Sequence, residues 1–180
     1  MPSNATTTGN IIASAKGTPV FTNIVLVAAT VFTGLAAGAI ALFAHTIMPG
    51  LKKTDDRTFV GAFQSMDRAI INPWFMTTFF GALILIAVAA VLHLGAGRRS
   101  VVPWLVAAFV LYLAVVIITM AVNVPLNDAI KAAGDPDRIN VAQARDAFNE
   151  SKWAAWNYVR VAAASGAFVI LAAVLTLNRR

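Results

Sequence analysis

Side chains capable of acid–base or oxyanion chemistry gather at four places in an otherwise apolar chain. They are His45 at the first place, Gln64, Asp67, Arg68 and Asn72 at the second, Asn123 and Asn127 at the third, and Trp156, Asn157 and Arg160 at the fourth. A carboxylate or an imidazole can remove a proton, whereas arginines and amides can donate hydrogen bonds to an oxyanion. Each place borders a long apolar run, where such groups are costly unless they pair or line a wet cavity. The pattern therefore predicts a shared polar pocket.

Several other kinds of chemistry are excluded by residue type. The 180 residues include no cysteine, which excludes disulfides, iron–sulfur clusters, thiolate metal sites and a cysteine nucleophile. The sequence also has no Gly-rich phosphate loop, HExxH motif or nucleophile elbow. We therefore predict no metal site and no organic cofactor. A copper or haem site at His45, with a nearby methionine, is the less favoured alternative.

The composition is that of an integral membrane protein. Hydrophobic residues make up 59% of the chain and charged residues 12%. Soluble domains average about 45–50% apolar and about 25% charged residues. So little charge cannot cover the surface of a water-soluble protein. The composition thus excludes an ordinary cytosolic enzyme, a disordered chain and, despite the net charge of +6, a nucleic-acid-binding module.

Four apolar runs predict the fold. They cover about residues 23–48, 74–94, 101–122 and 161–177, and a spanning helix needs about 20 residues. None of the runs shows the alternation of a β-barrel strand, so all four are expected to be helices. We predict an all-α, integral membrane four-helix bundle at 20–180, preceded by a flexible N-terminal tail at 1–19. No internal repeat is evident.

The distribution of charge predicts the orientation. All eight acidic residues fall on the side of the two longer loops. Basic residues without acids mark the side of the termini: Lys16, Arg98, Arg99, Arg179 and Arg180. By the positive-inside rule both termini are expected in the cytoplasm, with the polar pocket toward the extracytoplasmic side.

Helical periodicity continues into the two longer loops. Phe59, Phe63, Met66 and Ile70 recur at spacings of four and three, as on one face of an amphipathic helix. A second helical pattern begins near Val141, either separate from the fourth span or running unbroken into it. We therefore expect short amphipathic helices in both extracytoplasmic loops.

Small residues indicate where helices approach closely. Gly34 and Gly38 lie four residues apart in the first span, as do Ala162 and Gly166 in the fourth. This spacing lets two helix backbones pack tightly. The contact is expected within one subunit, and a homodimer face is the alternative.

Taken together, four motifs resemble a known family. They are Met48-Pro49, FQSMDRAIINPWF at 63–75, NVPLN at 123–127 and WAAWNYVR at 153–160. Their order and spacing resemble the anthrone-oxygenase-like family of small four-span membrane proteins, over roughly residues 25–178. Some fungal relatives oxidise an anthrone to an anthraquinone with O2 and are regarded as needing no organic cofactor. The resemblance implies a lipophilic aromatic ligand, with O2 as co-substrate.

The resemblance also marks particular residues. Its recurring polar positions fall on Gln64, Arg68, Asn72, Asn123, Asn127, Trp156, Asn157 and Arg160. Two candidates depart from the family's pattern. The family commonly has an amide at the position of Asp67, and His45 is not typical of it. The roles predicted for Asp67 and His45 therefore rest on the chemistry of their side chains and not on the resemblance.

Two hypotheses follow for the function. In the first, a membrane-embedded oxygenase oxidises an electron-rich aromatic or phenolic substrate that enters from the bilayer. Asp67 or His45 acts as base, Trp156 stacks on the substrate ring, and oxyanion donors come from Arg68, Arg160, Asn123 and Asn157.

In the second hypothesis, the protein is not an enzyme. It binds a lipid or a quinone, or it is an accessory subunit of a membrane complex. The amides then cap helix ends, and Asp67 pairs with Arg68, Arg160 or a loop lysine. The sequence leaves both hypotheses open.

Overall fold

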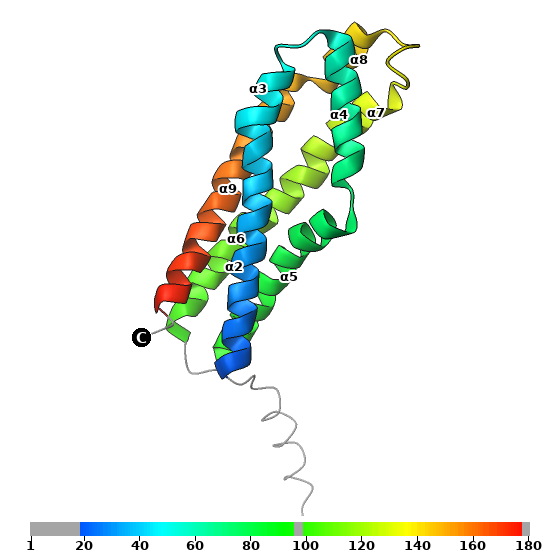
Figure 1. Ribbon diagram of the computed structural model, residues 1–180. Helices are drawn as coiled ribbons and strands as arrows, with labels where there is room; N and C mark the ends of the chain where they lie inside the picture. The colour runs from blue at the N-terminus through cyan, green and yellow to red at the C-terminus, as the bar shows by residue number, and fades with distance from the viewer. Residues whose placement is uncertain (1–18, 96–98, 178–180) are drawn as a thin grey trace, which may run out of the picture.

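The computed structural model describes residues 19–95 and 99–177, and every regular element in them is a helix (Figure 1). The predicted all-α bundle is thus confirmed. The predicted tail lies outside the described residues, apart from Pro19, which begins the first helix. The elements are α2 (Pro19–Leu42), η1 (Phe43–Ile47), α3 (Met48–Leu51), α4 (Asp56–Ile70), α5 (Pro73–Gly95), η2 (Arg99–Val101), α6 (Val102–Ile118), η3 (Thr119–Asn123), α7 (Val124–Ala132), α8 (Val141–Phe148) and α9 (Glu150–Leu177).

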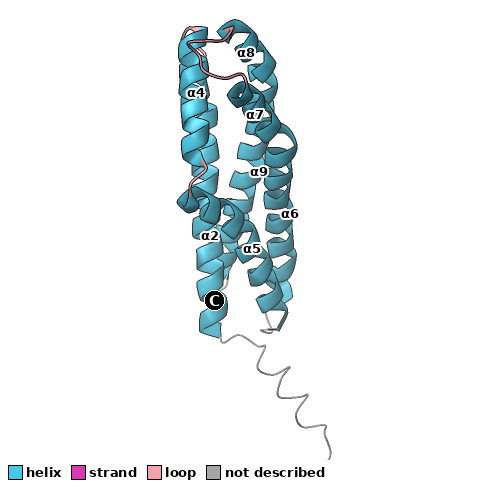
Figure 2. Ribbon diagram, turned by 90° about the vertical axis from the view of Figure 1, so that its right-hand side faces the viewer, coloured by secondary structure: helices cyan, strands magenta, loops and turns pink. Residues whose placement is uncertain are grey.

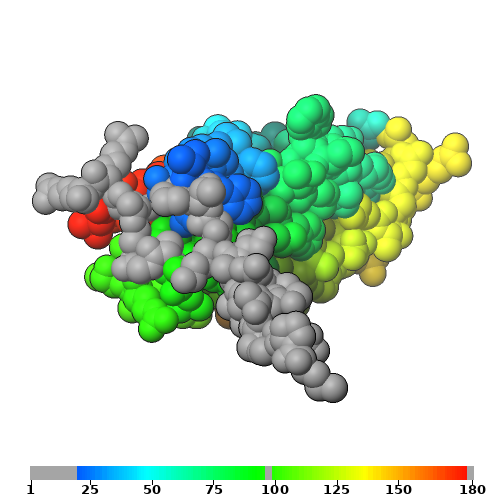
Figure 3. Space-filling model, turned by 90° about the horizontal axis from the view of Figure 1, so that it is seen from below, coloured from blue at the N-terminus to red at the C-terminus, as the bar shows by residue number. Residues whose placement is uncertain are grey.

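Four helical segments are long and apolar enough to cross a membrane, which makes this an integral membrane protein. They cover Val20–Leu51, Pro73–Gly95, Arg99–Ala132 and Val141–Leu177. In Figure 1 they run up and down in turn, so α2 begins and α9 ends at the same end of the bundle. Figure 3 looks at that end and shows the blue start of α2 beside the red end of α9. We call the opposite end, which carries α3, α4, α7 and α8, the distal end (Figure 2).

Two kinds of core hold the bundle together. In the membrane part, α2, α5, α6 and α9 pack in a ring around buried small residues such as Ala29, Ala82, Ala108 and Ala164. The hydrophobic effect does not drive helices together within lipid. Small residues let the helices approach closely, and van der Waals packing then stabilises their association. At the distal end the core is aromatic instead, and Phe148 lies among several ring neighbours. Large rings suit a region where water drives burial.

Two of the long helices are interrupted in the same way. The π-helical segments η1 and η3 each have five residues, and each ends two residues before a proline, Pro49 or Pro125. A proline within a helix lacks the N–H donor and crowds the carbonyl four residues earlier, so the preceding turn widens. The helix continues beyond Pro49 as α3, three residues past the predicted end of the first span.

The order of elements repeats along the chain, although the sequence shows no evident repeat. Each half has a long helix with a π-helical segment, a short helix and a second membrane helix: α2–η1–α3, α4 and α5, then α6–η3–α7, α8 and α9. The caps repeat too. Asp55 and Asn140 cap the short helices α4 and α8, and Asn72 and Asn149 cap the helices that follow them, α5 and α9. Each of these side chains accepts a hydrogen bond from the backbone N–H three residues later. Both halves therefore follow one plan.

The predicted amphipathic helices are present as α4, α7 and α8. The helical pattern from Val141 does not run unbroken into the fourth span, because Asn149 adopts a left-handed conformation with φ of 51° and separates α8 from α9. Asparagine tolerates this conformation better than most residues.

The small-residue pairs differ in their surroundings. A side chain at Gly34 would meet the ring of Phe168 at 2.8 Å, so this glycine permits close packing of α2 against α9. Gly38 and Ala162 are exposed, and Gly166 lies near Leu111. Gly34 thus serves packing within the subunit, and a homodimer face remains a hypothesis.

Candidate functional site

A cavity lies where α4 gives way to α5, beside η3 and α7. Its volume is about 310 Å³, near the lower end of the range of roughly 300–1,000 Å³ for small-molecule sites. Most of its wall is apolar, with aromatic rings from Phe43, Phe63, Phe75, Phe79 and Phe80. Ile71, Phe80 and Met120 line it while also being exposed on the outside of the bundle. The cavity therefore suits a compact apolar ligand and borders the exposed apolar surface of the bundle.

A chain of hydrogen bonds crosses one wall of this cavity. Asn127 Nδ2 donates to Asp67 Oδ1 at 2.6 Å, while Asn127 Oδ1 accepts from the indole Nε1–H of Trp153 at 2.7 Å. Lys131 Nζ pairs with Asp67 Oδ2 at 2.7 Å and with Asp128 at 3.0 Å. The indole can only donate, so the orientation of the Asn127 amide is fixed and its N–H must point to Asp67. Both carboxylate oxygens of Asp67 consequently face donors.

Arg160 supplies a different kind of charge. Its guanidinium lines the cavity, is 8% exposed and donates to Thr119 Oγ1 at 3.0 Å and to Asn157 Oδ1. The ring centroid of Trp153 lies 5.7 Å from Arg160 Cζ. Among the described residues no carboxylate forms an ion pair with Arg160, and Arg160 Nε is buried without a hydrogen-bond partner. A buried cation with neutral neighbours alone is costly, and a bound anion would offset that cost.

Both π-helical segments contribute to the cavity wall, Phe43 from η1 and Thr119 and Met120 from η3. Single π-helical turns are often found at functional sites, because the extra residue turns side chains off the regular helical face. In η3 the wider turn precedes the helix that carries Asn127 and Lys131.

The structure brings together several of the residues predicted from the sequence. Asp67, Asn127 and Arg160 line the cavity. Asn157 and Asn123 lie behind the wall and are buried. Asn157 holds the Arg160 guanidinium, and Asn123 Nδ2 donates to the Trp153 carbonyl at 3.3 Å.

Three other candidates make contacts outside the cavity wall. Gln64 Nε2 donates to the carbonyls of Ile130 and Gly134, which ties α4 to the end of α7. Asn72 caps α5, and Arg68 is exposed and donates to Gln64 at 3.3 Å. None of the three lines the cavity, and Gln64 and Asn72 hold the helices that form its walls.

The remaining two candidates lie outside the cavity. Trp156 is 39% exposed, because the buried face of α9 follows Trp153, Asn157 and Arg160 at spacings of four and three. His45 is exposed in η1, with its ring 5.6 Å from that of Tyr158. Within the part of the chain that the structure describes, no group of three or more His, Cys, Asp or Glu side chains could hold a metal ion.

The sequence analysis did not single out Thr119 and Lys131 as site residues, and it chose Trp156 instead of Trp153 as the aromatic wall. Trp153 precedes Arg160 by seven residues, so the two share a helical face. That spacing was the available signal for choosing Trp153 over Trp156 as the aromatic wall. Lys131 follows Asn127 by four residues, and its ion pair with Asp67 is the loop-lysine pairing that the second hypothesis expected as one of three possibilities.

Comparison with protein families identifies the chain. The family model described as anthrone oxygenase matches residues 75–170, just over half of the sequence. The chain belongs to the anthrone oxygenase family. The matched range contains Asn123, Asn127 and Arg160 but begins after Asp67. At family level, then, this anthrone oxygenase relative is an oxygenase-like membrane protein.

Searches of curated proteins and of solved structures each found no match to the chain.

Proposed function

We propose that the protein is a membrane-embedded oxygenase that oxidises a lipophilic aromatic substrate of the anthrone or phenol type with O2 in the cavity between α4, α5, η3 and α9. The observation that carries this proposal is the Arg160 guanidinium, which faces an apolar, aromatic cavity without a carboxylate partner among the described residues. A substrate that becomes a phenolate would provide the missing negative charge.

The chemistry needs a base and an oxyanion site. An anthrone carries an acidic CH2 group across the ring from its carbonyl. When a base removes one of these protons, the electron pair spreads to the carbonyl oxygen and gives a phenolate-like anion. Arg160 is placed to bind that oxygen, because guanidinium N–H groups stabilise a developing oxyanion most in a water-poor site. The Asp67 carboxylate is the candidate base, and its unused lone pairs remain available.

The electrons then pass to O2. The carbanion carbon and O2 form a C–O bond, which gives a peroxide anion that takes up the first proton, passed from Asp67 through the adjoining Lys131. Loss of the second CH proton and cleavage of the O–O bond leave a carbonyl, and the departing hydroxide is protonated to water. One O2 is consumed, with one oxygen atom in the quinone and the other in water.

The test is oxygen uptake and anthraquinone formation by detergent-purified protein with a simple anthrone, above the rate without protein. We expect Arg160→Met and Asp67→Asn each to lower the rate by about 10²–10³-fold, the range typical of losing an oxyanion donor or a general base. Arg138→Met, in an exposed loop, is the matched control and should keep the wild-type rate. Melting temperatures in the same detergent show which variants fold, and equal rates in wild type and folded Arg160→Met would refute the proposal.

A second candidate function uses the same cavity without turnover. An apolar pocket with one unpaired guanidinium also suits a quinone carbonyl, so a quinone-binding protein or accessory subunit is the alternative. Background uptake in the wild type, together with a quinone extracted from the purified protein, would favour it. Metal analysis of the same sample tests the copper or haem alternative at His45.

We also propose that both termini face the cytoplasm and the distal end faces the other side. The chain has no cysteine, so single-cysteine variants give clean reporters. Ser100→Cys lies in the basic connection between α5 and α6, and Ser65→Cys lies exposed on α4. In intact cells a membrane-impermeant maleimide should label Ser65→Cys and not Ser100→Cys, and the reverse pattern would overturn the orientation.

A further inference from the structure

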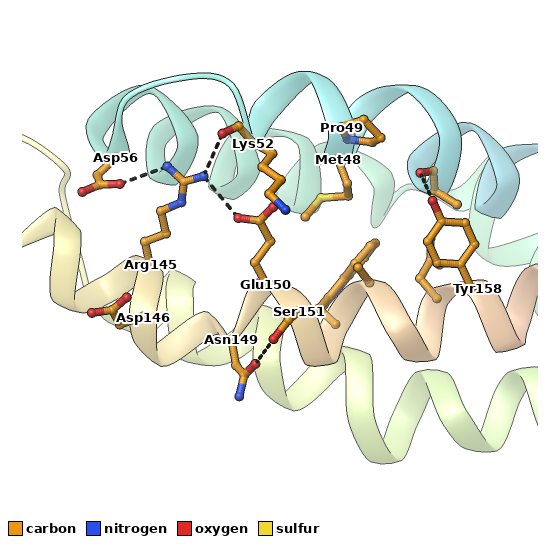
Figure 4. Close-up of a pocket in the computed structure, with 14 residues that line it drawn as sticks. Met48, Pro49, Lys52, Asp56, Arg145, Asp146, Asn149, Glu150, Ser151 and Tyr158 are labelled. Atoms are coloured by element: carbon orange, nitrogen blue, oxygen red, sulfur yellow. Dashed lines mark hydrogen bonds and ion pairs between the residues drawn. The ribbon is translucent and has the colours of Figure 1, made fainter.

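A second, larger hollow lies on the other half of the distal end. It has a volume of about 770 Å³ and is bordered by η1 and α3 on one side and by α8 and the start of α9 on the other (Figure 4). We call it the distal cleft. Trp153 lines both the distal cleft and the cavity of the proposed oxygenase site, so one indole forms part of both walls.

The distal cleft occupies the place that corresponds to the cavity in the repeated plan. The cavity is bounded by η3–α7 and α4–α5, and the distal cleft by η1–α3 and α8–α9. With Pro49 aligned on Pro125, three lining residues of the cleft correspond to three of the cavity: Ala44 to Met120, Met48 to Val124 and Lys52 to Asp128. The fold therefore builds a hollow of the same kind twice.

Arg145 is a fixed part of the cleft wall. Its guanidinium donates to Asp56 at 2.9 Å, to Glu150 at 3.2 Å and to the backbone carbonyl of Lys52 at 3.4 Å (Figure 4). It also donates to the carbonyl of Thr54 at 3.1 Å and lies 4.1 Å from the ring centroid of Phe59. These contacts satisfy both carboxylates. Of the five charged side chains of the cleft, Asp56, Arg145 and Glu150 are therefore paired with one another and not available to a charged ligand.

The two other charged side chains are free to bind a ligand. The Lys52 ammonium and the Asp146 carboxylate have no ion pair or hydrogen bond with another described residue, although the backbone carbonyl of Lys52 accepts from Arg145. Both residues line the distal cleft. Figure 4 shows Lys52 at the end of α3 and Asp146 on α8, on opposite walls. The cleft thus offers one ammonium and one carboxylate, which matches a ligand that carries a negative and a positive group.

The distal cleft is also polarised along the bundle. The charged residues lie at its outer end, and Ala44, Met48 and Tyr158 line the end nearer the membrane core. Glu150 and Tyr158 are eight residues apart on α9, a rise of about 12 Å. That length reaches from the polar headgroup layer of a bilayer into its apolar part. An amphiphile with its charged end outward fits this gradient.

We propose that the distal cleft binds a zwitterionic phospholipid with a primary ammonium, of the phosphatidylethanolamine type. Its phosphate pairs with Lys52, its ammonium donates hydrogen bonds to Asp146, and its glycerol and first acyl carbons lie against Met48 and Tyr158. A quaternary choline headgroup carries the same charges but has no N–H to donate to a carboxylate. The site therefore discriminates between two lipids of equal net charge.

Native mass spectrometry of the purified full-length protein tests this, after exchange into detergent with equal amounts of phosphatidylethanolamine, phosphatidylcholine and phosphatidylglycerol. Wild type should retain one phosphatidylethanolamine in preference to the other two lipids. Lys52→Gln should weaken its binding about tenfold, the effect of losing one charge-assisted contact of about 1.4 kcal/mol. Lys53→Gln, a neighbouring lysine that does not line the cleft, is the matched control and should bind as wild type.

Asp146→Asn supplies the sharper test. It should abolish the preference for phosphatidylethanolamine over phosphatidylcholine while the protein still binds both. Equal retention of all three lipids by wild type, or an unchanged preference in Asp146→Asn, would overturn the proposal. So would a preference of the wild type for phosphatidylglycerol. Oxygen uptake is not used in this test, so its result is independent of the proposed oxygenase function.

Discussion

The two hollows of the distal end share a backbone plan and differ in chemistry. Each is bounded by a π-helical segment, the short helix after a proline and a break between two helices. The cavity holds a buried guanidinium and a buried carboxylate among aromatic rings, whereas the distal cleft is wider and its charges lie near water. The comparison teaches that the repeated framework fixes where a hollow forms. The side chains at corresponding positions decide what it can bind.

One pair of corresponding residues shows this directly. With Asn72 aligned on Asn149, Arg68 corresponds to Arg145. Arg145 binds two carboxylates and backbone carbonyls across two segments, but Arg68 is exposed and its side chain bonds to Gln64 alone among the described residues. The same residue type thus joins separate segments in one half of the protein and lies on the surface in the other.

The largest expected loss of stability comes from replacing Arg145, the first residue of that pair. Arg145→Met should lower the free energy of unfolding by about 3 kcal/mol, since it leaves Asp56 and Glu150 together without a counter-ion and frees the carbonyl of Thr54. Arg68→Met should change it by no more than about 0.5 kcal/mol, as for most surface substitutions. Unfolding by SDS titration in mixed micelles measures both. Similar losses in the two variants would show that the halves are locked alike.

A smaller loss in the free energy of unfolding is expected from a change in the wall of the cavity. Asn127→Leu keeps the volume of the side chain but removes both hydrogen bonds that join Trp153 to Asp67. The buried indole N–H and one carboxylate oxygen then lose a partner, which should cost about 2 kcal/mol. The same titration measures the loss, and Trp153→Phe with Asn127→Leu should cost less than the sum of the single changes. Strict additivity would show that the hydrogen-bond chain does not act as a unit.

The two helix caps should give losses of about 1 kcal/mol. Asn72→Ala removes the cap of α5 and Asn149→Ala that of α9. The Asn149 variant should lose somewhat more, because alanine fits a φ of 51° poorly. Asn149→Gly accepts the conformation without the cap, so it should separate the two contributions when melting temperatures are compared.

The smallest effect depends on pH. Asp55 caps α4, and its hydrogen bonds from the Thr58 hydroxyl and backbone N–H hold the pKa of its carboxyl below the ordinary value of about 3.8. A lowered pKa in the folded state stabilises the protein above the unfolded value, and this stabilisation disappears as pH falls through the folded value. Asn140, the corresponding cap of α8, does not titrate.

Melting temperatures of wild type and Asp55→Ala should therefore differ slightly at pH 6, and the difference should shrink as pH falls through the lowered pKa of Asp55, below about 3.8. The difference between wild type and Asn140→Ala should stay constant over the same range. A difference for Asp55→Ala that does not change with pH would show that its cap depends on shape and not on charge.

Much of the fold could be predicted from the sequence. Long apolar runs have few solutions in lipid, so length and hydropathy predicted the four-helix bundle and the helices between its spans. The polar ends of the spans also indicated the region of the cavity, because antiparallel neighbours bring such ends together. Asp67, Asn127 and Arg160 were selected on that ground and do line it.

What could not be predicted depends on helix phase. A π-helical segment leaves no hydropathy signal. Its extra residue nevertheless shifts the side chains that follow from the positions that a regular α-helix would give them. Hence periodicity alone could not place Lys131 beside Asp67, or His45 outside the bundle. Trp156 and Trp153 are both tryptophans near Arg160, and only the phase of α9 separates the exposed one from the buried one. The repeat was hidden because corresponding positions carry unlike residues, such as Lys52 and Asp128.

The two π-helical segments have a consequence for how the chain can change in length. A single-residue deletion within Thr119–Asn123 would close the wide turn into ordinary α-helix and leave α7 in nearly its present phase, because the deletion removes the residue that the π turn absorbs. A deletion between Asn127 and Lys131, where the helix is regular, would instead turn Lys131 by about 100° relative to Asn127, so the two could no longer both reach Asp67. An equal deletion in the connection 133–140 would only shorten a loop. Among homologues, we therefore expect single-residue length differences in that connection and in η3, and nearly none between Asn127 and Lys131.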